Sequence, residues 1–244
     1  MTMGDIVLPH NVSIIPQETY YWCGPASCQV ALDVRGIGST ERDLASQLGT
    51  TTNGTNHIGL VAALLNRNVP ADYVVRQIPG NDATQAQKDL LWSDVKASIL
   101  GGYAVVVNVV VPPSNYPRGT RGERPAYAGG TVYHYFTVVG CNPDTREVLV
   151  ADSGFRPYEY WMNVDQLASC IAGKGYTATP NVAPIQPAPP VDTRSPADIE
   201  LSKRFQSKSK YRTNDDAIDS LAGMILNIDG RVHERSVERQ RGER

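Results

Sequence analysis

One stretch of the sequence decides the fold: Gln17-Glu18-Thr19-Tyr20-Tyr21-Trp22-Cys23-Gly24-Pro25-Ala26-Ser27. Apolar residues at helical spacing predict a helix over 24–34, which Gly36 can end in the left-handed conformation. Cys23 then lies at a helix N-terminus, where the macrodipole favours a thiolate, and Pro25 is well tolerated in the first turn. The stretch therefore predicts a nucleophilic thiol. The alternative is a buried cysteine that packs as a small hydrophobe, as most free cysteines do.

A base for this thiol is predicted from a later hairpin. Strands expected over 133–140 and 147–152, with the tip of the turn at 142–145, would place His134 directly opposite Asp152. Directly opposed residues share a face of the sheet, with Cβ atoms about 4.5–5.5 Å apart. The carboxylate could then accept the imidazole Nδ1–H and leave Nε2 for the thiol. His57 is a rival base.

Gln17 lies six residues before Cys23 and is a candidate oxyanion donor. Its side-chain amide and the backbone N–H of Cys23 could point at one spot, and each such donor is worth about 10²–10³ in rate. The alternative for Gln17 is a solvated loop residue.

The order of these motifs resembles the papain-like cysteine peptidases, and more closely cysteine peptidase family 39, the double-glycine leader peptidases and their relatives. The resemblance covers roughly residues 12–170 and is carried by 22–26, 49–60, 95–102, 134–140 and 149–152. It implies an α+β papain-like fold in which Cys23 is the nucleophile, His134 the base, Asp152 the orienting carboxylate and Gln17 the oxyanion donor.

The sequence departs from this family in two places. Ser153 follows the aspartate where relatives often have proline, and a long segment over 112–130 precedes the histidine strand. This segment carries three arginines, which we expect either to be solvated or to form a flap that steers acidic peptide groups. The residues expected to bind substrate are Trp22, Gly24, Tyr133, Arg118, Arg121 and Arg124.

The rest of the chain indicates one main domain. Further helices are expected over 41–48, 60–66 and 93–100, and the β-branched run 105–111 predicts a central strand. A helical half followed by a sheet half is an α+β domain. We assign residues 1–179 to the peptidase domain, 180–197 to a proline-rich linker and 198–244 to a short segment, helical in part.

Composition excludes several classes of function. The formal net charge is -2, which gives no bulk attraction to nucleic acid, and no apolar run approaches the length of a spanning helix. The N-terminus has no signal-peptide pattern. The four cysteines lack zinc-ligand spacing and are too few for a disulfide framework, so we expect free thiols, no metal and no cofactor.

A peptidase domain followed by a proline-rich linker also resembles the peptidase module of endolysins from phages that infect mycobacteria. This resemblance implies synthesis in the host cytoplasm, cleavage of peptidoglycan peptides at the cell wall after release, and a second lytic or wall-binding partner. In that case the arginines of the 112–130 segment would face stem-peptide carboxylates. The alternatives are a peptidase or acyltransferase acting on a leader peptide or other protein, and a non-catalytic peptide-binding module of the same fold.

Overall fold

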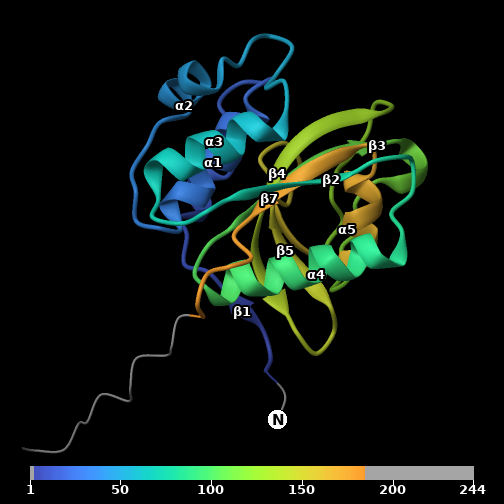
Figure 1. The fold of residues 1–244 in the computed structure, drawn as a ribbon. Helices are drawn as coiled ribbons and strands as arrows, with labels where there is room; N and C mark the ends of the chain where they lie inside the picture. The colour runs from blue at the N-terminus through green and yellow to red at the C-terminus, as the bar shows by residue number, and fades with distance from the viewer. Residues whose placement is uncertain (1–2, 185–244) are drawn as a thin grey trace, which may run out of the picture. The chain divides into compact units, whose positions relative to one another are not determined.

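The computed structural model describes residues 3–184, which form a seven-stranded antiparallel sheet and five α-helices (Figure 1). The strands are β1 (Ile6–Val7), β2 (Val74–Ile78), β3 (Val105–Val111), β4 (Val132–Asn142), β5 (Glu147–Ala151), β6 (Glu159–Asn163) and β7 (Lys174–Ala178). The helices are α1 (Cys23–Asp33), α2 (Glu41–Leu48), α3 (Ile58–Asn68), α4 (Gln85–Leu100) and α5 (Val164–Ile171), with short 3₁₀ turns at Val12–Ile14 and Pro113–Asn115.

The sheet is built around β3 and β4. Its strand order is β2-β7-β3-β4-β5-β6, and β1 pairs with the far end of β4. The sequence of β3 is almost all valine, and its side chains are buried on both faces, as a central strand requires. β7 is the last strand in the chain but lies between β2 and β3, so the sheet is completed only when residues far apart in sequence meet.

The helices fall into two groups, which Figure 1 shows on different sides of the sheet strands. α1 packs against α2, α3 and β4, and the Thr137 hydroxyl of β4 donates to the Ser27 carbonyl of α1 at 3.0 Å. α4 and α5 contact each other and pack on β3. Gly36 follows α1 with φ of 71°, the left-handed conformation expected of a helix stop. The contacts with β4 hold the N-terminal half of α1 against the sheet.

The predicted α+β class is confirmed, but the predicted order of helices and strands along the chain is only partly right. α2 and β3 have the predicted bounds, whereas α4 begins at Gln85 rather than at residue 93. Its start is a capping box between Thr84 and Gln87, which precedes the apolar residues used to predict the helix. Five elements were not predicted: β1, β2, β6, α5 and β7. β2 precedes α4, and α5 lies between two strands, so helices and strands alternate more than expected.

The predicted register of the β4–β5 hairpin is wrong. Asn142 pairs with Glu147 beyond a turn held by the Asn142 side chain, and a bulge then shifts the register so that Thr137 pairs with Ala151. Continuing this register would set Asp152 opposite Phe136 rather than His134. Residues two apart on a strand share a face, so the error leaves His134 on the face of the sheet that the prediction needed.

The predicted linker beyond residue 184 and the predicted helical segment at 198–244 lie outside the described residues, and the proposed domain boundaries remain predictions. Among residues 3–184, no helix has the length and apolar character needed to cross a membrane.

Candidate active site

Cys23 is the first residue of α1, and 9% of its surface is exposed. Burial alone would raise the pKa of its thiol. The hydrogen bond and charge of His134 outweigh burial, with help from hydrogen bonds to the backbone of Tyr135 and Gly24, so that the pKa of Cys23 lies below its ordinary value. By contrast, burial raises the pKa of Cys28 on the same helix. The two thiols are therefore chemically distinct.

His134 and Asp152 meet as an ion pair. His134 Nε2 donates to Asp152 Oδ1 at 2.8 Å, and both side chains are buried. Burial disfavours the imidazolium, but the charge and hydrogen bond of Asp152, together with Cys23, raise the pKa of His134 to about 10. The roles of the two ring nitrogens are therefore the reverse of those predicted. Nε2 faces the carboxylate, and Nδ1 is the nitrogen left for the sulfur.

The Asp152 carboxylate accepts four hydrogen bonds. Oδ1 accepts from His134 and from the Gly154 backbone N–H at 3.0 Å, and Oδ2 accepts from the hydroxyls of Tyr127 at 2.7 Å and Tyr160 at 2.8 Å. Sequence reasoning missed both tyrosines. A tyrosine in a long loop and another in an unpredicted strand carry no local signal of this contact.

The Gln17 side chain is held at both ends. Its Oε1 accepts from the Ser153 hydroxyl at 2.9 Å, and its Nε2 donates to the Thr19 carbonyl at 2.7 Å. The Gln17 backbone N–H also donates to the Ser153 carbonyl at 3.0 Å. A primary amide has two N–H donors, so one remains for a ligand in the cleft that Gln17 and Cys23 both line. Ser153, which directly follows Asp152, is thus bonded to the predicted oxyanion donor.

Ser153→Ala is expected to lower the rate of catalysis about tenfold with little change in KM, because the Gln17 amide loses the bond that orients it. Gln17→Ala should cost more, about 10²–10³-fold. Steady-state kinetics on a cleavable peptide would measure both values. Ser169→Ala removes a hydroxyl that bonds Asn115 and Gln166 away from the cleft, and it serves as the control. Equal effects of the two serine variants would contradict the assignment.

A cleft of about 430 Å³ opens over these groups. Two large aromatic side chains that line this cleft are exposed to solvent. Tyr20, from the loop before α1, is 82% exposed, and Tyr133, from the start of β4, is 69% exposed. Tyr133 was predicted to contact substrate, and Tyr20 was missed. The lining is formed by Pro16, Gln17, Glu18, Thr19, Tyr20, Cys23, Val132, Tyr133, His134, Ser153, Gly154, Phe155 and Tyr158.

Three other predicted site residues lie outside this lining. Trp22 is the residue before α1 and packs edge-on against Tyr21. Gly24 is required for close packing instead, because a Cβ there would lie 2.9 Å from the Cβ of Thr55. His57, the rival base, precedes α3 and is exposed.

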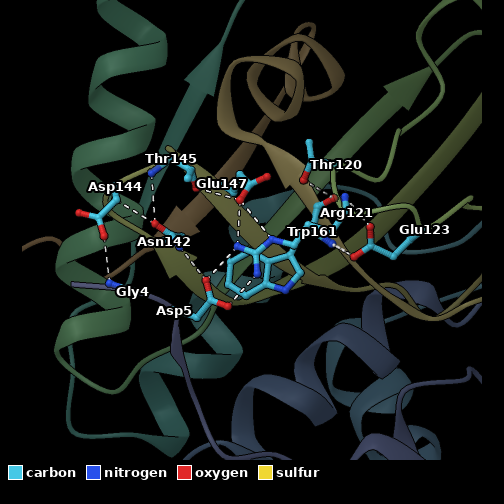
Figure 2. A network of polar contacts seen from close by, with 10 residues as sticks. All are labelled: Gly4, Asp5, Thr120, Arg121, Glu123, Asn142, Asp144, Thr145, Glu147 and Trp161. Atoms are coloured by element: carbon cyan, nitrogen blue, oxygen red, sulfur yellow. Dashed lines mark hydrogen bonds and ion pairs between the residues drawn. The ribbon is translucent and has the colours of Figure 1, made fainter. Parts of the chain in front are cut away.

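Arg121 is engaged in a polar network rather than free to bind substrate, which corrects its predicted role in a flap. Figure 2 shows its guanidinium between two carboxylates: it donates to both oxygens of Asp5 at 2.7 and 2.8 Å and to Glu147 at 2.9 Å. The guanidinium also lies 3.8 Å above the Trp161 ring. These contacts join the N-terminal strand to β5 and β6.

Arg118 and Arg124 also lie outside the cleft lining. The Arg118 side chain donates to the Ser114 carbonyl at 3.4 Å, and Arg124 lines a separate hollow with Arg156. No arginine of the 112–130 segment therefore lines the cleft above Cys23 in the part of the chain that is described.

Arg121→Ala is expected to lower the free energy of unfolding by about 1–2 kcal/mol, because one change removes a bidentate ion pair and a cation–π contact. Chemical denaturation would measure this loss, which should shrink in high salt. Arg124→Ala is the matched control because it lies three residues away and makes no ion pair among residues 3–184. Equal stability of the two variants would show that the network contributes nothing.

The shifted pKa values predict selective alkylation. The thiol of Cys23 should ionise at lower pH than an ordinary thiol, whereas burial raises the pKa of Cys141 to about 11 and that of Cys170 to about 12. Iodoacetamide at pH 6, followed by peptide mass spectrometry, should modify Cys23 at least about tenfold faster than any other cysteine. The rate should fall sharply in His134→Ala. Uniform modification of all cysteines would refute the thiolate assignment.

Within residues 3–184, no three His, Cys, Asp or Glu side chains lie close enough together to hold a metal ion.

Comparison with known proteins identifies the sequence class. A family model described as "Peptidase_C39 like family" matches residues 9–182. An uncharacterised protein of Methanothermobacter marburgensis is 35% identical over 65 residues, which cover 27% of this chain and 46% of that relative. The chain thus matches less than half the length of this curated relative.

Several solved structures are similar, and two of them illustrate the likeness. The peptidase domain of Streptococcus ComA, described as a bi-functional ABC transporter involved in quorum sensing, is 18% identical with a TM-score of 0.41, over 67% of this chain and 96% of that one. A double glycine motif protease from an AMS/PCAT transporter, in complex with the leader peptide, is 11% identical with a TM-score of 0.42, over 73% of this chain and 96% of that one. At these identities the likeness concerns the fold alone.

Proposed function

The chain belongs to the Peptidase C39-like family, and from this premise we propose that it is an active cysteine peptidase with Cys23 as its nucleophile. One observation carries the proposal: His134 forms an ion pair with the buried Asp152 and lowers the pKa of the Cys23 thiol, and Cys23 and His134 both line an open cleft. A buried structural cysteine would need neither an ion-paired imidazole nor access to solvent.

The proposed mechanism is acyl transfer in two steps. The Cys23 thiolate attacks the carbonyl carbon of the scissile bond, and the free N–H of Gln17 donates to the developing oxyanion. The His134 imidazolium gives its proton to the leaving amine, which leaves a thioester on the sulfur and a neutral imidazole. The imidazole then takes a proton from a water molecule as the water oxygen attacks the thioester carbonyl, the C–S bond breaks, the acid product leaves, and the thiolate–imidazolium pair is restored.

For the substrate, we propose the peptide moiety of bacterial peptidoglycan, cleaved by the protein acting as a phage endolysin. Support comes from the proline-rich stretch after the peptidase segment, which suits a linker to a wall-binding or second lytic partner. Arg118, Arg121 and Arg124 do not line the cleft, so they give no support to recognition of stem-peptide carboxylates. Glu18 is the one acidic residue in the cleft lining, and it suits a substrate with a free amine such as that of a stem or bridge peptide.

The test is digestion of purified actinobacterial peptidoglycan by the full chain and by Cys23→Ala, with mass spectrometry of the soluble fragments. New amino termini at stem-peptide bonds that are absent with Cys23→Ala support the endolysin. Intact peptidoglycan, together with cleavage of added unstructured or leader-like peptides, would replace it with a peptide-processing enzyme. Peptide binding without cleavage by either form would favour a non-catalytic module.

A further inference from the structure

The Asp152 carboxylate is more heavily bonded than the orientation of one histidine requires. The residue is 0% exposed, and each of its oxygens accepts two hydrogen bonds. His134 and the Gly154 backbone occupy Oδ1, so Oδ2 depends entirely on the hydroxyls of Tyr127 and Tyr160. Hydrogen bonds to a carboxylate favour its charged form, whereas burial without them favours the neutral acid.

The two tyrosines reach Asp152 from different elements. Tyr160 belongs to β6, and its side chain is almost fully buried. Tyr127 belongs to the long segment between β3 and β4. Its ring stacks on Phe155 at 3.8 Å, and Phe155 in turn meets the His134 ring edge-on at 5.5 Å. The long segment therefore places a hydroxyl beneath the active site.

This segment is anchored on both sides of Tyr127. The Ala126 backbone N–H donates to the Arg156 carbonyl at 2.9 Å. The Tyr116 hydroxyl donates to the Gly130 carbonyl at 2.6 Å, and the Tyr116 ring lies 5.6 Å from that of Tyr127. Tyr127 is thus fixed in position by neighbours that do not themselves touch Asp152.

Both hydroxyls act as donors throughout the working range of pH. Burial, together with the charge of Asp152, raises the pKa of Tyr127 and of Tyr160 well above the ordinary value. Neither phenol ionises near neutral pH, and neither can take a proton from the aspartate. They form a fixed pair of donors on Oδ2, which we call the tyrosine clamp.

We propose that the tyrosine clamp, Tyr127 with Tyr160, holds the Asp152 carboxylate directed at His134, and that it thereby sets the lowest pH at which Cys23 reacts. The two tyrosines are positioning residues, since they act on the sulfur only through Asp152 and His134. The consequence for peptide cleavage rests on the proposed function, but the consequence for thiol reactivity does not.

Few other ionisable groups face the clamp. His134 approaches Asp152 from β4, Cys23 of α1 lies beyond that imidazole, and Cys170 of α5 lies near Tyr160. Burial raises the pKa of Cys170 to about 12, so it stays neutral across the range of the experiment. A change in the acidic limb of Cys23 reactivity after mutation of the clamp can therefore be traced to Asp152.

The test measures Cys23 alkylation as a function of pH in the wild type, Tyr127→Phe, Tyr160→Phe and the double variant. Phenylalanine keeps each ring and removes only the hydroxyl. We expect the acidic limb to move upward by about one pH unit in the double variant and by less in each single variant, the size of shift that loss of a hydrogen bond to a charged group produces. Tyr176→Phe is the control, because that hydroxyl donates to another buried carboxylate, Asp94, outside the cleft.

An unmoved acidic limb in folded Tyr127→Phe and Tyr160→Phe would overturn the proposal, as would an equal shift in Tyr176→Phe. Thermal melting establishes that each variant folds, and either single variant suffices if the double variant does not. A wild type that is alkylated selectively but cleaves no peptide would refute the proposed function while leaving the clamp testable. A wild type that cleaves peptides while the tyrosine variants keep its pH profile would refute the clamp alone.

Discussion

Replacing Cys23 with serine is expected to reduce peptide hydrolysis by at least about 10⁴-fold while leaving the fold intact. Serine is close in size, so α1 and its packing against β4 should be unchanged. Its hydroxyl is a far weaker acid than a thiol, and the His134–Asp152 pair, which holds a proton up to a pH of about 10, is arranged to stabilise an anion that serine does not form. Single-turnover kinetics on a cleavable peptide would measure the loss.

The matched control is Cys28→Ala on the same helix. Cys28 is fully buried, and burial raises the pKa of its thiol, so it has no part in the cleft chemistry. We expect this variant to lose stability through the small cavity but to keep its turnover. Activity that survives in Cys23→Ser, or that disappears equally in Cys28→Ala, would show that Cys23 is not the nucleophile.

The positions of the central site residues could be read from the sequence because their signals are local. A cysteine before Gly-Pro at the start of an apolar repeat places Cys23 at a helix N-terminus without any knowledge of the sheet. His134 lies on β4 and Asp152 directly follows β5, and a short turn joins these two strands, so their approach depends on few residues. Beyond the bulge the register was wrong by two residues, which preserves the face on which His134 lies.

The parts that were missed depend on contacts between distant segments. Tyr127 reaches Asp152 from the loop between β3 and β4, and Arg121 meets Asp5, which lies 116 residues earlier in the chain, so neither contact has a signature in a short window. The short strand β7 pairs with β2 on one side and with β3 on the other, and both of these strands lie far from it in the sequence. The imidazole orientation depends on side-chain rotation, which strand pairing does not determine.

Asp152→Asn is expected to lower catalysis by about 10³–10⁴-fold, the range typical for loss of the carboxylate of a triad. The charge of Asp152 is the largest influence that raises the pKa of His134 to about 10. Without it, burial dominates and the pKa of His134 falls, so the imidazolium and its partner thiolate are lost together at neutral pH. The alkaline limb of the activity profile should therefore move to lower pH in whatever activity remains.

The donors around Asp152 make this substitution more damaging than the loss of charge alone. An asparagine offers one oxygen and one NH₂ group, yet four donors converge on its position, so at least one donor is left facing another. Asp94→Asn is the control, since Asp94 is also buried and bonded to a tyrosine hydroxyl. We expect both variants to lose stability in denaturant melts, but only Asp152→Asn to lose Cys23 alkylation at pH 6. If Asp94→Asn loses as much alkylation, the effect belongs to the fold rather than to the His134–Asp152 pair.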